Sequence, residues 1–392
     1  MLLPIVFSNH CNLDCAYCCI TNKNTSPVLS LEKAIDHIEK NKSLYGEENL
    51  EIEFFGGEPT LHWNEIKAII DKYPNACYKI ITNGLMPILF EDYKYWEKIE
   101  DIIVSIDGFS LLYNTGRRLT SSQLNDILAN TKNLLQINPN VGIGIVIGNQ
   151  KQLNGLRQNL ADFIDIGINY FALELVTVWE DDKPKYLEKE ELLIFVDAVV
   201  SLIKDTTIGY LRVVHIPREL ISGSFYFNKL KGKSCGEGVR ALSPRGKVYL
   251  CRDHAADEEG LLKKIEESEY RPVRFIGEAK LDPLVGFQDD GNNFSQLDHY
   301  NVLTSCPVKS IQYETYGNPD KLWWLIDGFD TFQESILQPL WFLTEMNNKF
   351  VKDFYINGYV DDKKYIDFRN QLSLGIQLIE KQIDVHKLKT CK

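Results

Sequence analysis

Six short apolar runs alternate with longer amphipathic stretches over about the first 206 residues of this 392-residue chain. The apolar runs are rich in Val, Ile and Phe, which is typical of strands buried on both faces of a sheet. The expected strands are residues 2–8, 50–57, 77–84, 101–108, 141–148 and 169–176. Repeated strand–helix units predict a parallel sheet, either open and doubly wound or curled into a partial barrel.

The amphipathic stretches between these strands predict the helices, which are residues 30–46, 121–138, 154–167 and 188–206. Ser30 and Ser121 stand where two of these helices begin, and serine is a favoured N-cap residue. In both sheet arrangements ligands bind beyond the carboxyl ends of the strands. The residues that directly follow each strand therefore form the candidate site.

Composition and charge exclude several classes of protein. The chain is 44% hydrophobic and 25% charged, as an ordinary globular protein is. No apolar run approaches the roughly 20 residues of a membrane span, and the N-terminus lacks the basic segment of a signal peptide. The net charge of -12 disfavours nucleic acid as a partner. We therefore expect a cytoplasmic protein that binds neither membranes nor nucleic acid.

The loop after the first expected strand concentrates four cysteines, Cys11, Cys15, Cys18 and Cys19. The total of nine cysteines is odd, and cytoplasmic thiols stay reduced, so a disulfide knot is disfavoured. Zinc sites usually pair two close ligands with a second close pair, which the spacing C-x3-C-x2-C does not supply. Three thiolates from one loop suit an iron–sulfur cubane with one open iron. Cys19 falls outside this spacing, and we expect it to be a structural thiol.

The cysteine spacing, with Tyr17 before the third cysteine and "FFGGEPTL" after the second strand, resembles the radical S-adenosylmethionine (SAM) superfamily. The resemblance covers residues 1 to about 210 and implies a partial (β/α)6, TIM-like barrel. It implies that Cys11, Cys15 and Cys18 bind a [4Fe–4S] cluster whose open iron is chelated by SAM. One electron from the cluster then cleaves SAM to a 5′-deoxyadenosyl radical, which abstracts hydrogen from an unactivated C–H bond.

The resemblance also assigns SAM contacts around the first two loops. Tyr17 would pack against the adenine ring, and Gly56 and Gly57 would let the backbone approach the methionyl amino group. Glu58 would help to hold that ammonium group, and Pro59 would fix the turn.

Later loops supply further candidates. Asn83 in "TNG" is expected to contact SAM. The segment "SIDG" resembles a region of the peptide- and protein-modifying branch, and this resemblance implies that Ser105 holds the SAM carboxylate together with Arg117 or Arg118. The sequence assigns no catalytic acid or base. Candidates for that role are Asp107, Glu174 and Glu180.

A second cysteine set begins in an expected hairpin at residues 233–251, where Cys235, Gly246 and Cys251 are spaced C-x10-G-x4-C. This spacing resembles the opening hairpin of SPASM and twitch domains, which bind auxiliary iron–sulfur clusters. Only Cys306 follows before the tail, so the pattern is closer to a twitch domain with one cluster. The fourth ligand is left open between Cys391, Asp253, His254 and the substrate. Buried thiols without a cluster, or a zinc site that shares His254, are the alternatives.

Three domains are expected: a radical SAM barrel (1–210), a twitch- or SPASM-like cluster domain (211–320) and a helical extension (321–392). The predicted activity is maturation of a ribosomally made peptide by crosslinking, epimerisation or oxidation, with a flavodoxin or ferredoxin as electron donor. Because the first strand begins at residue 2, without a leader-binding domain before it, dehydrogenation of a small alcohol, sugar or aminocyclitol is the alternative. A non-catalytic metal-binding scaffold is the third hypothesis, against which the intact cysteine and GGEP motifs argue.

Overall fold

A computed structural model describes residues 1–18, 20, 23–147, 150–175, 178–180, 183–185, 189–207, 213–215, 239–249, 252–257, 336, 338–357 and 362–390. The chain divides into two compact units, each assembled from separate stretches of sequence. The first unit comprises Met1–Ile106, Asn114–Val141 and Ser222–Thr315, and the second comprises Asp107–Tyr113, Gly142–Ile221 and Tyr316–Lys392.

The first unit is built on parallel strands, as the sequence predicts. They are β1 (Leu2–Val6), β2 (Glu51–Phe55), β3 (Cys77–Thr82) and β4 (Asp101–Ser105), paired in that order. One row across the sheet consists of Ile5, Phe54, Ile80 and Ile102, which face each other in register and are completely buried. Burial of such apolar side chains is the main stabilising contribution to this unit. The expectation of an α/β fold with a parallel sheet is confirmed.

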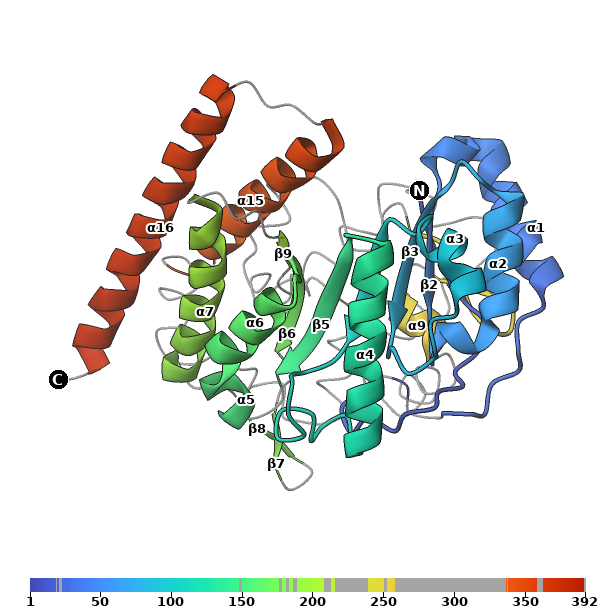
Figure 1. Ribbon diagram of the computed structural model, residues 1–392, viewed down its shortest axis with the longest axis horizontal. Helices are drawn as coiled ribbons and strands as arrows, with labels where there is room; N and C mark the ends of the chain where they lie inside the picture. Colours follow the sequence, from blue (N-terminus) through green and yellow to red (C-terminus); the bar gives the residue numbers. More distant parts are fainter. Residues whose placement is uncertain are drawn as a thin grey trace, which may run out of the picture. The chain divides into compact units, whose positions relative to one another are not determined.

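Four helices of the first unit alternate with these strands along the chain (Figure 1). They are α1 (Leu31–Tyr45), α2 (Trp63–Lys72), α3 (Tyr93–Trp96) and α4 (Ser121–Ile137), with the short 3-10 turns η1 (Glu47–Asn49), η2 (Pro59–His62) and η3 (Phe90–Asp92). Ser30 caps α1 as predicted, since its side chain accepts a hydrogen bond from the Lys33 N–H. The prediction for Ser121 is wrong: Thr120 is the cap, because Thr120 and Gln123 form a reciprocal capping box.

The hairpin expected around Gly246 is confirmed within residues 239–249. Strands β10 (Ala241–Leu242) and β11 (Val248–Tyr249) are antiparallel, and β10 extends the sheet beside β1 with Leu242 opposite Ile5. Gly246 occupies the turn at φ +81°, a left-handed backbone that favours glycine. The short helix α9 (Arg252–Ala256) follows the hairpin.

The second unit also has parallel strands. They are β5 (Val141–Ile147), β6 (Tyr170–Leu175) and β9 (Val213–His215), of which β9 was not expected from the sequence. The small hairpin of β7 (Val178–Glu180) and β8 (Lys183–Lys185) was also missed. The helices are α5 (Gln150–Asn154), α6 (Leu156–Asp165), α7 (Lys189–Thr207), α15 (Gln338–Asn357) and α16 (Asp362–Thr390).

The C-terminal helices belong to the core of the second unit. Helix α16 lies along α7 (Figure 1), and it contacts both α7 and α15. Its buried apolar residues include Leu372, Ile376, Ile379 and Ile383. Lys204 of α7 forms an ion pair with Glu380 of α16 at 2.7 Å. No helix among the described residues has the length and hydropathy to cross a membrane.

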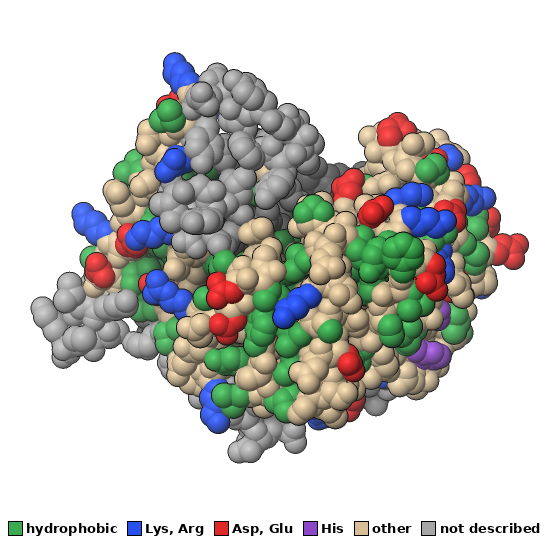
Figure 2. Space-filling view, viewed as in Figure 1, with side chains coloured by type: hydrophobic (Ala, Val, Ile, Leu, Met, Phe, Trp, Pro, Cys, Tyr) green, Lys and Arg blue, Asp and Glu red, His purple; other side chains and the backbone are tan. Residues whose placement is uncertain are grey.

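Acidic and basic side chains are interspersed on the face seen in Figure 2. The expected domain boundaries at residues 210 and 320 both lie outside the described residues and stay predictions.

Candidate functional site

The loop after β1 carries Cys11, Cys15 and Cys18, which form no disulfide and have partly exposed side chains. Burial raises the pKa of the Cys11 thiol to about 11, and the charges of Glu58 and the two neighbouring thiols add to this rise. Such a thiol keeps its proton at neutral pH until a metal displaces it. Among the described residues, no three His, Cys, Asp or Glu side chains converge on one position as the ligands of a single ion would.

The turn after β2 lies directly against this loop. The Gly57 N–H donates to the Ser8 carbonyl at 3.1 Å, and the Glu58 N–H donates to the His10 carbonyl at 2.7 Å. A Cβ at position 57 would overlap the His10 carbonyl oxygen. Gly56 has φ +132°, and a Cβ there would come within 2.8 Å of Val6 Cγ1. Both glycines are therefore required by close contact with the end of β1 and the loop that follows it, and an approach to SAM stays a prediction.

Glu58 is buried, and its carboxylate organises the turn. Its Oε1 accepts hydrogen bonds from the Thr60 N–H, the Thr60 hydroxyl and the Thr82 hydroxyl, and its Oε2 accepts from the Asn83 N–H at 2.7 Å. Burial raises the pKa of Glu58, and these four donors oppose the rise. Pro59 is buried at the start of η2. The described contacts of the Glu58 side chain hold the loops after β2 and β3 together.

Asn83 joins the loop after β3 to the cysteine loop. Its Nδ2 donates to Asn12 Oδ1 at 2.6 Å and to Cys11 Sγ at 3.8 Å, while its Oδ1 accepts from the Leu85 N–H. The Leu13 N–H also points to Cys11 Sγ, at 3.4 Å. Two N–H donors around one sulfur fit a thiolate, which accepts hydrogen bonds and donates none. The cysteine set and these donors therefore fit an iron–sulfur cluster held by Cys11, Cys15 and Cys18.

Tyr17 and Arg117 lie together in the structure. The Arg117 guanidinium stands 5.5 Å from the centroid of the Tyr17 ring, and Arg117 is buried. A Cβ on Gly116 would overlap the Tyr17 ring, and the Gly116 carbonyl accepts from the Ala16 N–H at 2.7 Å. Residues 116–117 thus pack on the last turn of the cysteine loop.

Ser105 and Arg118, the other expected clamp residues, and Asp107, a candidate acid or base, are all within the described part of the chain. Ser105 is the last residue of β4 and is partly exposed. Arg118 forms an exposed ion pair with Asp14 at 2.7 Å, and Asp14 also pairs with Lys23 at 3.2 Å. Asp107 is buried, and its carboxylate accepts from the Val146 N–H at 2.9 Å. This bond gives Asp107 a structural role at the end of β5.

Two asparagines that fix the cysteine loop were missed by sequence analysis. Asn9 Oδ1 accepts from the Thr25 and Ser26 N–H groups, and Asn24 Oδ1 accepts from the Cys11 N–H at 3.0 Å. The left-handed backbone of Asn24, at φ +61°, is one that asparagine adopts more readily than most residues. The asparagine that ends the "TNKN" segment is the sequence signal that could have indicated this turn.

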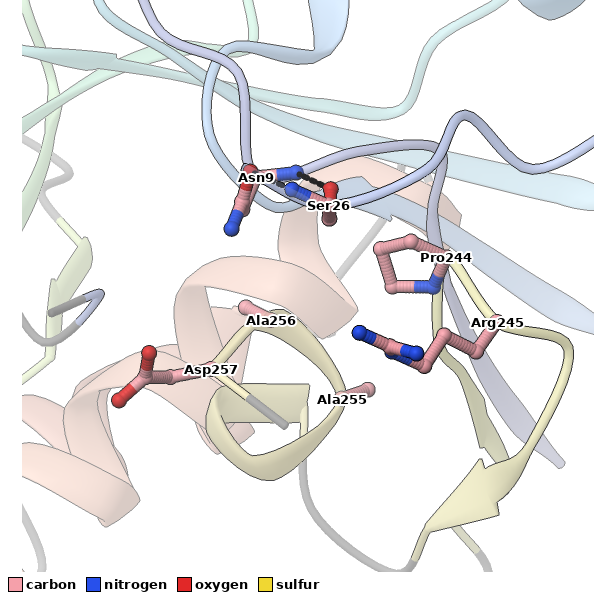
Figure 3. Close-up of a pocket in the computed structure, with 7 residues that line it drawn as sticks. All are labelled: Asn9, Ser26, Pro244, Arg245, Ala255, Ala256 and Asp257. Atoms are coloured by element: carbon pink, nitrogen blue, oxygen red, sulfur yellow. Dashed lines mark hydrogen bonds between the residues drawn. The ribbon is translucent and has the colours of Figure 1, made fainter. Parts of the chain in front are cut away.

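The hairpin segment (residues 239–257, with residues 250 and 251 outside the described part) packs against the cysteine loop. Figure 3 shows a small pocket lined by Asn9 and Ser26 on one side and by Pro244, Ala255 and Ala256 on the other. An apolar cluster against which Cys18 and Phe55 pack contains Val6, Ile20, Ala241, Tyr249, Ala255 and Ala256. Arg252 adds an ion pair with the buried Glu53 at 2.6 Å. Strand β11 and helix α9, which flank Cys251 in sequence, therefore both pack beside the cysteine loop.

Several expected residues lie outside the described residues. They are Cys19, Cys235, Cys251, Cys306 and Cys391. Asp253 and His254 lie on the described backbone of α9, and Glu180 lies on β7. Their predicted roles stay predictions.

Comparison with known proteins finds a family model that matches the residues around the cysteine loop. Residues 5–160 match the family model described as the Radical SAM superfamily. The match spans the three cysteines, the GGEP turn, Asn83 and Arg117.

Two curated relatives match over longer stretches. The radical SAM cyclopropyl synthase TigE of Paramaledivibacter caminithermalis is 26% identical over 309 residues, which are 70% of this chain and 63% of TigE. An uncharacterized Methanocaldococcus jannaschii protein is 30% identical over 207 residues, which are 48% of this chain and 65% of that protein. The chain thus spans less than two thirds of each relative.

A solved structure shares the fold. Streptococcus suis SuiB bound to the precursor peptide SuiA matches with a TM-score of 0.55 at 14% identity, covering 82% of this chain and 75% of SuiB.

Proposed function

We propose, on the premise that residues 5–160 form a radical SAM superfamily domain, that this chain is a radical SAM enzyme whose Cys11, Cys15 and Cys18 bind a [4Fe–4S] cluster. The observation that carries the proposal is the tethering of the cysteine loop. Backbone and side-chain hydrogen bonds join it to the GGEP turn and to Asn83. These three successive strand ends are where a parallel α/β fold binds its ligands.

The chain's own residues would position SAM. Glu58 fixes the turn whose backbone is expected to face the SAM amino group, and Ser105 with Arg117 would hold the SAM carboxylate. Tyr17 would pack against the adenine ring. When bound, the cluster and SAM together supply a 5′-deoxyadenosyl radical that abstracts hydrogen from the substrate. Enclosure by the cysteine loop and the segment around Arg117 would exclude water from that chemistry.

An auxiliary iron–sulfur cluster in a twitch-like domain, bound by Cys235, Cys251 and Cys306, is part of the proposal. The β10–β11 hairpin with Gly246 at its turn supports it, because the C-x10-G-x4-C spacing predicts that hairpin. The packing of β11 and α9 beside the Cys18 loop gives a second argument. An iron there with an open coordination position could take up an electron or bind substrate.

The proposed substrate is a ribosomally made peptide, modified by crosslinking, epimerisation or oxidation in the cytoplasm. SuiB, solved with a precursor peptide, has this fold, and TigE is named for forming a carbon ring. A flavodoxin or ferredoxin would supply the electron. Dehydrogenation of a small alcohol, sugar or aminocyclitol is the second candidate. A neighbouring gene for a short peptide favours the first, and a sugar-pathway neighbourhood favours the second.

The test is formation of 5′-deoxyadenosine after anaerobic reconstitution with iron and sulfide and reduction in the presence of SAM. We expect product from the parent and none from a variant with Cys11, Cys15 and Cys18 changed to Ala. Cys77→Ala is the matched control, because Cys77 is a free thiol of β3 that donates to Glu100 and lies outside the loop. Cleavage of SAM by the triple variant would refute the proposal.

A further inference from the structure

We propose that Asn83 is a positioning residue that sets the reduction potential of the iron–sulfur cluster through its hydrogen bond to Cys11 Sγ. The inference deepens the proposed function and rests on it. It assigns to Asn83 a role toward a cluster ligand, in addition to the SAM contact expected from the sequence.

The geometry fixes which atoms of the Asn83 amide face the sulfur. The Leu85 N–H can only donate, and it lies 3.0 Å from the atom assigned as Oδ1. The amide nitrogen must therefore face the cysteine loop. Its two protons have two acceptors, Asn12 Oδ1 at 2.6 Å and Cys11 Sγ at 3.8 Å. A rotated amide would set an oxygen against the sulfur and a nitrogen against the Leu85 N–H.

Burial and a backbone hydrogen bond also restrict the position of Asn83. Asn83 is 7% exposed, and its backbone N–H donates to the buried Glu58 carboxylate at 2.7 Å. Glu58 in turn belongs to the turn that bonds to the His10 carbonyl next to Cys11. The path from Glu58 through Asn83 to Cys11 thus joins three loops by hydrogen bonds. The Leu13 N–H is the second donor to the same sulfur.

The expected effect follows from charge. A cluster gains one negative charge on reduction, and hydrogen bonds to its sulfurs favour the reduced form. Loss of the Asn83 donor should therefore lower the potential. A net hydrogen bond of about 0.5–1.5 kcal/mol corresponds to a change of about two- to tenfold in the reduction equilibrium. A tenfold change in a one-electron couple is about 59 mV.

The experiment is a redox titration of the reconstituted holoprotein, followed by electron paramagnetic resonance. The signal to follow is the one that disappears in a Cys15→Ala variant. Asn83→Leu removes the donor, and Asn83→Asp keeps an acceptor for the Leu85 N–H while adding negative charge. Asn130→Leu is the matched control, because Asn130 Nδ2 donates to the Gly84 and Met86 carbonyls of the same turn and has no described bond to a cysteine.

We expect both Asn83 variants to shift to more negative potential, with Asn83→Asp shifted further, and Asn130→Leu to match the parent. If Asn83→Leu fails to fold, Asn83→Asp carries the test. Unchanged potentials in iron-loaded Asn83 variants would overturn the inference and leave the proposed function intact. An equal shift in Asn130→Leu would overturn it too, because the effect would then belong to the turn as a whole. A parent without the loop's cluster signal would overturn the proposed function itself.

Discussion

At the scale of single residues, the candidate site depends on how closely two loops approach each other. Gly57 brings the turn after β2 against the His10 carbonyl, with no room for a side chain between them. The hydrogen bonds from Gly57 and Glu58 to the cysteine loop depend on that approach. The position of Cys11 therefore depends on glycine, which has no side chain, at position 57.

Gly57→Ala should lower the free energy of unfolding by about 1–3 kcal/mol, the usual cost of overpacking, and should reduce the iron bound at the loop. Gly167→Ala is the control. Gly167 has φ +100°, and no atom of the described residues lies within 4 Å of the place that a Cβ would take, so only backbone strain of about 1–2 kcal/mol is expected. Chemical denaturation and iron analysis of both variants check this. Full iron loading in Gly57→Ala would contradict the expectation.

Residue types and spacing predict that the three cysteines and the GGEP turn form the candidate site. They do not predict the hydrogen bonds around these residues. The Asn83–Cys11 bond joins residues 72 positions apart, and it depends on the shape of two turns. The contact of Glu58 with SAM stays a prediction, and the donors from Thr60, Thr82 and Asn83 that surround its carboxylate could not be predicted from the sequence. Local patterns carry no information on which distant donors a side chain will meet.

At the scale of elements, the hairpin segment is tied to the first helix. His37 of α1 donates from Nε2 to the Arg240 carbonyl at 3.0 Å. Burial lowers the pKa of His37, and the charges of Lys40 and Arg240 lower it further. The neutral imidazole is thus the form that the folded state favours.

Stability should accordingly fall as the pH drops below about 6.5, the ordinary pKa of an unfolded histidine, because the unfolded chain then binds more protons. His37→Gln keeps a donor for the Arg240 carbonyl but cannot titrate, so it should lose less stability between pH 7 and pH 5. Burial also lowers the pKa of His62, so part of the slope should remain. Urea unfolding at both pH values tests this. Identical pH slopes for the variant and the parent would exclude a role for His37.

Element types were largely predictable, because strongly apolar runs and 3.6-residue periodicity mark them. Strand β1 was expected at 2–8 and is Leu2–Val6, and α7 was expected at 188–206 and is Lys189–Thr207. Strand β9 was missed because three residues are too short for a periodicity signal. Thr120 and Ser121 are adjacent hydroxyl residues that cap helices about equally well, and the reciprocal hydrogen bonds with Gln123 select Thr120 as the cap.

At the scale of the whole molecule, the chain folds into two units that each draw on distant stretches of sequence. The first unit joins β1–β4 to the hairpin segment near residue 245, and the second joins β5 and β6 to the C-terminal helices. The domain boundaries predicted at residues 210 and 320 lie outside the described residues and stay predictions. Long-range pairing, such as that of Ile5 with Leu242, cannot be recognised from local pattern.

The central claim is that the loop of Cys11, Cys15 and Cys18 holds a four-iron cluster. Its most direct test is the number of irons and acid-labile sulfides per chain after anaerobic reconstitution, in the parent and in the triple Ala variant. We expect about four fewer irons per chain in the variant than in the parent, since the variant loses the one [4Fe–4S] cluster that the loop is proposed to bind. Equal iron in both proteins, or a parent that binds zinc and no iron, would contradict the claim.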